Sequence, residues 1–215
     1  MAYGIQSLNS SSSILIDQNY TNLYLKEEGT LAFSGATAED FVEIGAPSNL
    51  TREDLLFVQC DTAGIYLYKR ANSTASSTKL GAIGPAGTVR YRIYGRTDSN
   101  VLPAGTGYGL EVYNAAEDLV FSSNLKVPRI TKRYYGQMPI IDSLDSVVGN
   151  VWACVAGTEW FRVRSSPDFY DYQCVECYKT GTTSYFRPLM QSASVSNSLF
   201  AGSNPNLVNI LFIQD

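Results

Sequence analysis

Residues 3–19 read YGIQSLNSSSSILIDQN and residues 108–124 read YGLEVYNAAEDLVFSSN, so one stretch occurs twice in altered form. The two stretches align without a gap, and the identical pairs are Tyr3/Tyr108, Gly4/Gly109, Asn9/Asn114 and Asn19/Asn124. Each has an apolar segment, a polar turn that opens at asparagine and a second apolar segment, which is the pattern of a β-hairpin. We therefore predict an all-β chain, with one or two β-sandwich-like domains built from hairpins and partly duplicated.

Other segments also carry strand signals. Residues 89–94 alternate between an apolar and a basic-aromatic face, which predicts a strand. Residues 55–60 and 65–69 flank the turn 61–64 and predict a second hairpin, and residues 151–155 and 159–164 flank the turn 156–158 and predict a third. The apolar run 207–213 predicts a buried strand. The small, polar and glycine-rich stretch 71–87 predicts a long loop, either solvated or ordered by a neighbouring subunit.

The composition of residues 96–107 is that of a linker between the two copies of the repeat. It predicts an N-terminal β domain over residues 1–100 and a C-terminal β domain over residues 105–215. A single integrated β domain is the alternative.

Composition limits the classes of function. The formal net charge is -4, which argues against a nucleic-acid partner. The chain has no histidine, so it lacks the usual general base and the commonest metal ligand, and a Ser-His-Asp triad is impossible. No segment resembles a secretion signal, and none approaches the ~20 apolar residues of a membrane helix. We expect a protein that is made in a cytoplasm, does not insert into membranes and holds no cofactor.

Two patterns point weakly to chemistry. The Cys174–Cys177 spacing is that of half a zinc site, which would need Cys60 and Cys154 as further ligands. Without a secretion signal we expect all four cysteines to be free thiols and predict no metal. Paired carboxylates could serve glycoside hydrolysis, but such pairs are also ordinary turn residues, so we predict that the chain is not an enzyme. These pairs are Glu39/Asp40, Asp142/Asp145 and Asp168/Asp171.

The region 160–187 is dense in aromatic and basic residues. The candidate interface or receptor surface consists of Tyr170, Tyr172, Tyr178, Tyr185, Arg162 and Arg164, with Lys179 and Arg187 nearby. Rings and charged groups bind sugars or a protein receptor, but tyrosine and arginine are also enriched where subunits pack together, and we favour packing. We expect the basic residues elsewhere to pair with acidic neighbours; they are Arg90, Arg92, Arg96, Lys132 and Arg133.

The second copy of the repeat and its surroundings resemble tailed-bacteriophage virion proteins. In tail-associated proteins of that kind, a Tyr-Gly-Leu-x-Val-x-Asn hairpin is followed by an apolar pair and then by Phe-Asp/Ser-Ser. Here residues 108–114 and 119–123 match that pattern, and residues 3–9 are similar to the start of small tail proteins. The resemblance implies a structural part of the virion, in the tail, tail tip or baseplate, made in the host cytoplasm. Its partners would be copies of itself, as a trimer or higher oligomer, and other tail proteins. The alternatives are a receptor- or glycan-binding tail module and a capsid decoration or head-fibre protein.

Overall fold

The computed structural model describes residues 6–8, 14–17, 23–36, 42–43, 54–71, 78–95, 109–113, 115, 117, 119–137, 144–155, 169–194 and 207–214. These residues hold sixteen β-strands and no helix, which confirms the predicted all-β fold class. Within them, no helix has the length and apolarity to cross a membrane.

The chain divides into two compact units, and each is built from two separate stretches. Unit 1 consists of Met1–Lys26 and Tyr94–Pro128, and unit 2 consists of Glu27–Ile93 and Arg129–Asp215. The domain boundary predicted between residues 100 and 105 lies outside the described residues. In unit 2, strands from both sides of that boundary pair within one sheet.

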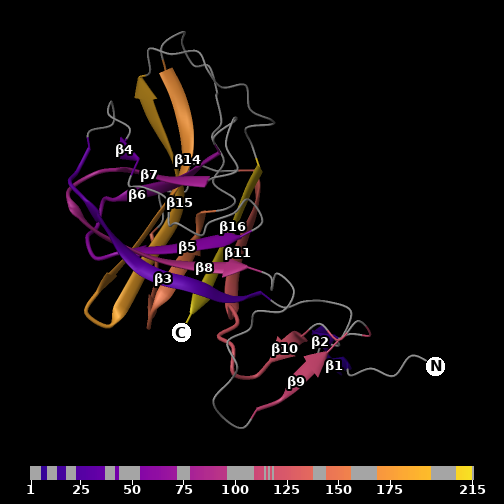
Figure 1. Ribbon diagram of the computed structural model, residues 1–215. Helices are drawn as coiled ribbons and strands as arrows, with labels where there is room; N and C mark the ends of the chain where they lie inside the picture. The colour runs from indigo at the N-terminus through magenta and orange to yellow at the C-terminus, as the bar shows by residue number, and fades with distance from the viewer. Residues whose placement is uncertain are drawn as a thin grey trace. The chain divides into compact units, whose positions relative to one another are not determined.

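Unit 1 contains the two predicted hairpins. Strands β1 (Gln6–Leu8) and β2 (Ile14–Asp17) pair antiparallel, and so do β9 (Glu111–Tyr113) and β10 (Leu119–Ser122). Each pair is a separate two-stranded sheet in the described part of the chain (Figure 1). Both hairpins of the repeat are therefore confirmed.

The two hairpins have the same register. With the offset of the repeat (111 − 6 = 105), pair 6/17 corresponds to 111/122, pair 7/16 to 112/121 and pair 8/14 to 113/119. Both ladders also contain a bulge at the same place, because Leu15 and Val120 are the residues left without a partner. A bulge is a specific feature of a strand pair, so its recurrence confirms the partial duplication at the level of the backbone.

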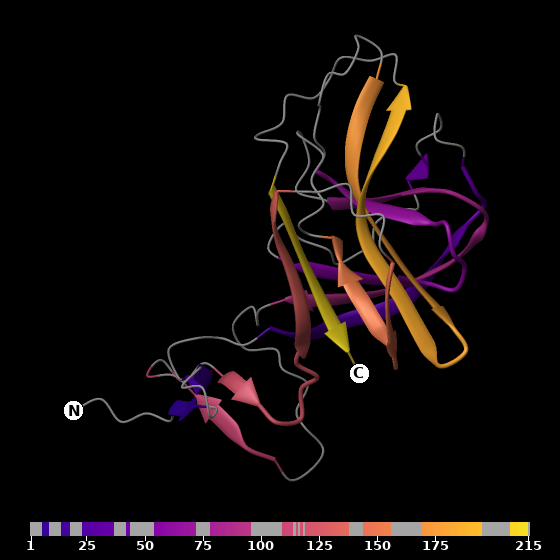
Figure 2. The ribbon, with the colours of Figure 1, turned by 180° about the vertical axis from the view of Figure 1, so that it is seen from behind.

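The other twelve strands form one sheet with two branches (Figures 1 and 2). The two branches meet where β5 pairs with β14, at Cys60 and Tyr178. The first branch has the order β3 (Tyr24–Phe33), β8 (Gly87–Gly95), β5 (Leu55–Cys60), β13 (Val151–Cys154), β16 (Leu207–Gln214) and β11 (Ile130–Gln137). The second has the order β12 (Asp145–Val148), β15 (Thr183–Ser194), β14 (Phe169–Thr180), β6 (Tyr66–Ala71), β7 (Thr78–Ile83) and β4 (Val42–Glu43).

Both branches contribute to one hydrophobic core. The first supplies Val58 and Ile93 among others, and the second supplies Leu67 and Val175. The rings of Phe186 (β15) and Phe212 (β16) lie 4.6 Å apart between their centroids, one from each branch. Two sheet faces that bury their alternate residues against each other make the architecture β-sandwich-like. The predicted strands at 89–94 and 207–213 are confirmed as β8 and β16, which both have buried residues.

Polar contacts also link the two branches away from the β5–β14 pairing. Ala36 and Gly84 exchange backbone hydrogen bonds of 2.9 and 3.0 Å. Lys132 of β11 forms an ion pair with Asp145 of β12. Within the first branch, Arg92 Nε lies 3.2 Å from Glu28 Oε2. The expectation that basic residues pair with acidic neighbours is confirmed for Lys132 and for Arg92.

Two local predictions are wrong. Residues 55–60 and 66–71 are strands, but they do not pair with each other, because β14 lies between β5 and β6. Residues 78–83 are not part of a loop, since they form β7 and pair with β6 along its whole length. The glycine-rich composition that hid this strand has a packing role, because a Cβ at Gly81 would lie 2.1 Å from the ring of Tyr68. The second strand of the third predicted hairpin, 159–164, lies outside the described residues.

Candidate functional site

The β14–β15 hairpin carries the residues of the candidate surface that the structure describes. Its strands pair in an unbroken register from Phe169/Ser194 to Thr180/Thr183, around a turn at Gly181 and Thr182. Figures 1 and 2 show the two ribbons running together along their whole length. Such a register fixes which side chains are neighbours across the strands.

Alternation along β14 separates two environments. Val175 and Cys177 belong to the main core, whereas Cys174 packs with Tyr68 and Ile83 in a second cluster on the other side of the sheet. Because successive residues of a strand point to opposite faces, Glu176 and Tyr178 share the side of Cys174, and Tyr178 also packs against the main core. Their cross-strand partners are Arg187 and Tyr185 in β15, and Glu176 also pairs with Tyr66 in β6. We call the set Tyr66, Glu176, Tyr178, Tyr185 and Arg187 the aromatic face.

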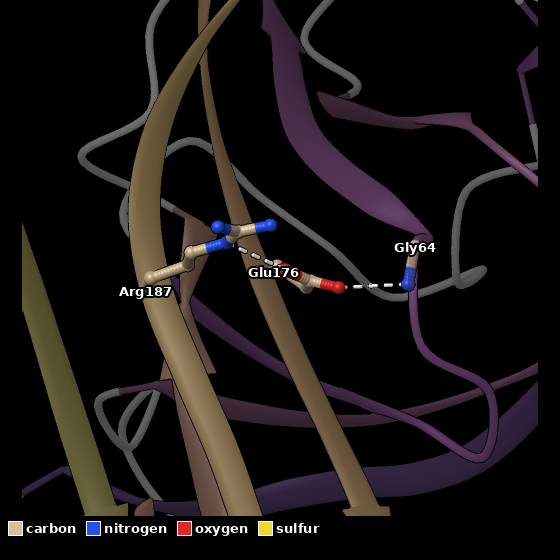
Figure 3. Close-up of polar contacts among 3 residues, drawn as sticks. All are labelled: Gly64, Glu176 and Arg187. Carbon is tan, nitrogen blue, oxygen red and sulfur yellow. Dashed lines mark hydrogen bonds and ion pairs between the residues drawn. The ribbon is translucent and has the colours of Figure 1, made fainter. Parts of the chain in front are cut away.

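An ion pair between the buried Glu176 and the partly buried Arg187 lies at the centre of the aromatic face (Figure 3). Glu176 is only 3% exposed, and its two carboxylate oxygens accept hydrogen bonds from different elements. Gly64 N–H donates to Oε1 (2.7 Å), and Arg187 Nε–H donates to Oε2 (2.7 Å). Burial acts to lower the pKa of Arg187, but the hydrogen bond and charge of Glu176 outweigh it and raise that pKa. Arg187 therefore stays charged, and the pair holds β15, β14 and the turn before β6 together.

Two tyrosine rings stack at the turn end of the hairpin. The ring centroids of Tyr178 and Tyr185 are 5.1 Å apart and their planes differ by 15°. Burial, followed by the negative charge of Glu176, raises the pKa of Tyr178, so its hydroxyl stays protonated at neutral pH. Half-buried stacked rings beside a guanidinium group offer van der Waals area and hydrogen-bond donors for a non-covalent contact.

The structure brings together some of the predicted site residues. Tyr178 and Tyr185 are neighbours, and Arg187 lies on the same face. Tyr170 and Tyr172 belong to β14, but their side chains lie outside the described residues, as do Arg162 and Arg164 entirely. Sequence reasoning missed Glu176 and Tyr66. The signal for Glu176 was present, since a single acidic residue inside an apolar strand requires a partner.

The four cysteines are free and buried. Cys174 and Cys177 lie in different clusters on opposite faces of β14, because a spacing of three in a strand reverses the side-chain direction. Among the described residues, no group of three or more histidine, cysteine, aspartate or glutamate side chains is placed to hold a metal ion. Burial raises the pKa of Cys177 to about 12 and raises that of Cys60 well above its ordinary value of 9.0.

These thiols are expected to be unreactive in the folded protein. Because the thiolate is the reactive form, native protein at pH 8 should not react with an aromatic disulfide reagent, whereas denatured protein should release four equivalents of thiolate. The raised pKa values also link stability to pH. The neutral buried thiols stabilise the fold below the unfolded-state pKa of about 9, and this contribution is lost as the pH rises toward 12. Rapid labelling of native protein at pH 8 would contradict the burial of these side chains.

Unit 1 presents a different kind of surface. Leu110, Tyr113 and Val127 are large apolar side chains that are 48%, 51% and 47% exposed. The Tyr113 hydroxyl donates to Glu111 Oε2 (2.8 Å), so both side chains lie on the outer face of β9. Val112, between them, is buried. The second hairpin therefore has both buried residues and exposed apolar side chains.

Comparison of the chain with protein-family models, with curated proteins and with solved structures finds no match. Function is therefore inferred from the repeated hairpin of unit 1 and the aromatic face of unit 2.

Proposed function

We propose that this chain is a structural, non-enzymatic component of a tailed-bacteriophage particle, at the tail, tail tip or baseplate. It assembles as a homo-oligomer, a trimer or higher, and contacts other tail proteins. The observation that carries the proposal is the repeated hairpin, whose register and bulge coincide in both copies. Its second copy has the Tyr-Gly-Leu-x-Val-x-Asn sequence that resembles tail-associated virion proteins.

The charged groups of unit 2 support a structural role. Glu176 is engaged by Arg187 and by the Gly64 backbone, and Asp145 is engaged by Lys132. A carboxylate that serves as an acid or base must be free to exchange a proton with a substrate. These two instead join strands that are distant in sequence, as expected for a scaffold whose free energy comes from buried contact area.

The proposal predicts that the protein is found in the assembled particle. Virions purified from the source that encodes the chain are labelled with an antibody against it and viewed by electron microscopy. We expect label on the tail or its tip. We also expect every particle to carry the same number of copies, and that number should fit the rotational symmetry of the tail. Label on the head would instead favour a capsid decoration or head-fibre protein. Protein in the infected-cell lysate but absent from purified particles would overturn the proposal.

A second candidate is a receptor- or glycan-binding tail module that uses the aromatic face. The observation that favours it is the half-buried Tyr178/Tyr185 stack beside Arg187, since sugars bind to rings and charged groups together. Particles carrying Tyr185→Ala test it. Loss of adsorption to host cells by intact particles would favour receptor binding, whereas loss of assembled particles would favour the structural role.

A further inference from the structure

The first branch of unit 2 ends in two long strands that are paired on one side. Within the described residues, β3 pairs only with β8 and β11 pairs only with β16, so these strands are the edges of the branch. Strand β3 has ten residues and β11 has eight, against about five or six in a typical strand. An unpaired edge presents a row of backbone N–H and C=O groups, and native sheets keep such edges short or cover them. Both edges are therefore candidate docking sites for a further strand.

The two edges belong to the same unit but do not meet within one chain. At the start of β3, Leu25 N–H already donates to the Lys126 carbonyl oxygen (2.9 Å). Residues 27–33 of β3 belong to unit 2, as does all of β11. The two strands stand at opposite ends of a row of six, so five inter-strand spacings of roughly 24 Å in total separate them. A strand that pairs with either edge must come from elsewhere.

The β3 edge is acidic on both of its faces. Phe33 belongs to the main core, and alternate residues of β3 share its side of the sheet. Glu27 is one of them, and its Oε1 accepts a hydrogen bond (2.5 Å) from the hydroxyl of the core residue Tyr91. Glu28 points to the opposite, outer face, where its side chain is 49% exposed. With Lys26, the strand carries two carboxylates and one amine.

The β11 edge is basic on both of its faces. Its charged residues are Lys132 and Arg133, which are both exposed. Lys132 pairs with Phe212 of the main core, and its Nζ lies 5.5 Å from the ring centroid of Phe186, so it stands on the core side. Arg133 is the next residue and therefore points to the outer face. Each face of this edge thus carries one cation where β3 carries one carboxylate.

The signs of these charges select which edges can meet. Opposite charges at facing or diagonal positions of neighbouring strands stabilise a sheet, and like charges destabilise it. Two β3 edges would bring Glu28 near its own copy, and two β11 edges would do the same with Arg133. A β3 edge beside a β11 edge instead brings Glu28 and Arg133 together on the outer face. On the core side it brings Glu27 and Lys132 together, so the unlike edges match on both faces.

We propose that unit 2 associates edge to edge with further copies of this chain, with β3 of one copy pairing with β11 of the next. The inference rests on the proposed homo-oligomeric role and names the surface through which it acts. Each copy has one acidic and one basic edge, so the contact is head-to-tail and repeats around a ring. Backbone hydrogen bonds of the added strand supply affinity, and the charges determine which edges pair.

The test is the mass of the full chain in solution, measured by sedimentation equilibrium over a wide range of concentrations. Glu28→Arg reverses the outer-face charge of β3, Arg133→Glu reverses that of β11, and the double variant exchanges the two signs. The matched control is Arg90→Glu, which makes the same charge change at an exposed position of β8, a strand that is not an edge. Circular dichroism verifies that all variants keep the β content of the wild type.

We expect an oligomer for the wild type and for the control. Each single variant should associate at least about tenfold more weakly, because like charges then face each other across the contact. The double variant should recover most of this loss, because opposite charges meet again. An effect on folding alone would not be reversed by the second substitution.

Three results would overturn the inference. If the wild type is oligomeric and both single variants are equally so, association uses another surface and the homo-oligomeric role stands. If the single variants are weakened and the double variant does not recover, β3 and β11 do not face each other. If the wild type is monomeric at every concentration, edge-to-edge association is excluded. Antibody labelling of particles decides the virion role separately, because a chain absent from virions can still self-associate and a monomer can still be incorporated.

Discussion

Replacing Gly84 with alanine is expected to lower the free energy of unfolding of unit 2 by about 4 kcal/mol. Gly84 has φ +131°, a backbone conformation that residues with a Cβ rarely adopt. A Cβ there would lie 2.1 Å from the Gly64 carbonyl oxygen. The nearest atoms are backbone, so no side chain can rotate away. Relief would require movement of the chain at residues 64–65 or of the Ala36/Gly84 bridge, which links the two branches.

The matched control is Gly64→Ala. Gly64 also has a positive φ (+81°), but a Cβ there would meet only the ring of Pro85, with Cδ at 3.6 Å, which is ordinary contact. We expect a loss of about 1–2 kcal/mol, from the left-handed backbone alone. Urea unfolding followed by tryptophan fluorescence measures both variants. Equal losses for the two substitutions would show that the close approach of Gly84 to Gly64 does not constrain the fold.

Replacing Arg187 with methionine is expected to destabilise unit 2 by about 3 kcal/mol, because the substitution leaves the carboxylate of Glu176 buried without its cation. Methionine preserves most of the apolar stem of the side chain, so the loss reports the charge. Glu176→Gln is expected to cost less, since the amide oxygen can still accept the hydrogen bond from Gly64 N–H. Together with the double variant, these form a cycle in which the double loss is smaller than the sum of the single losses.

The Arg92–Glu28 pair provides the comparison for an exposed interaction. The Glu28 side chain is 49% exposed, so Glu28→Gln should change the free energy of unfolding by no more than about 1 kcal/mol. Thermal unfolding at low and high salt separates the two pairs further, because screening weakens the pair with the exposed carboxylate more than the pair with the buried one. Additive losses in the Glu176/Arg187 cycle would mean that the two residues stabilise the fold independently.

The fold class and the repeat could be predicted because their signals are local. Alternation of apolar and polar residues specifies strands, and a gapless repeat specifies that two hairpins share one register. Residues 14–16 and 119–121 even preserve the extra residue of the bulge, although no sequence pattern identifies it in advance. The strand at 207–213 was recognisable because its residues form an apolar run, which is typical of a strand that is buried on both faces.

Strand pairing could not be predicted, because it depends on segments far apart in the chain. The turn at residues 61–64 has the composition of a hairpin turn, yet β14 separates the strands on either side of it. The turn is instead held by the carboxylate of Glu176 and by Asp61, which accepts a hydrogen bond of 2.8 Å from Thr88 N–H. Strand β7 was hidden because glycine and serine indicate a loop unless the neighbouring ring that requires the glycine is known.

The candidate site shows the same division between local and distant information. The density of tyrosine and arginine in residues 160–187 located the hairpin that carries the aromatic face. It did not show that Tyr178 and Tyr185 are cross-strand partners, or that Tyr66 approaches from β6. The Cys174–Cys177 spacing lies within strand β14, so the two thiols face opposite sides of the sheet and do not form half of a zinc site.

The position of β16 constrains when the protein can fold. This strand pairs with β11 on one side and with β13 on the other, so β11 has no partner in the first branch until residues 207–214 have been synthesised. Unit 1 is likewise incomplete until residues 94–128 have been synthesised, because it consists of Met1–Lys26 and Tyr94–Pro128. The nascent chain therefore emerges from the ribosome with apolar strands unpaired, and its productive folding is a late, collective event that follows translation of nearly all of these residues.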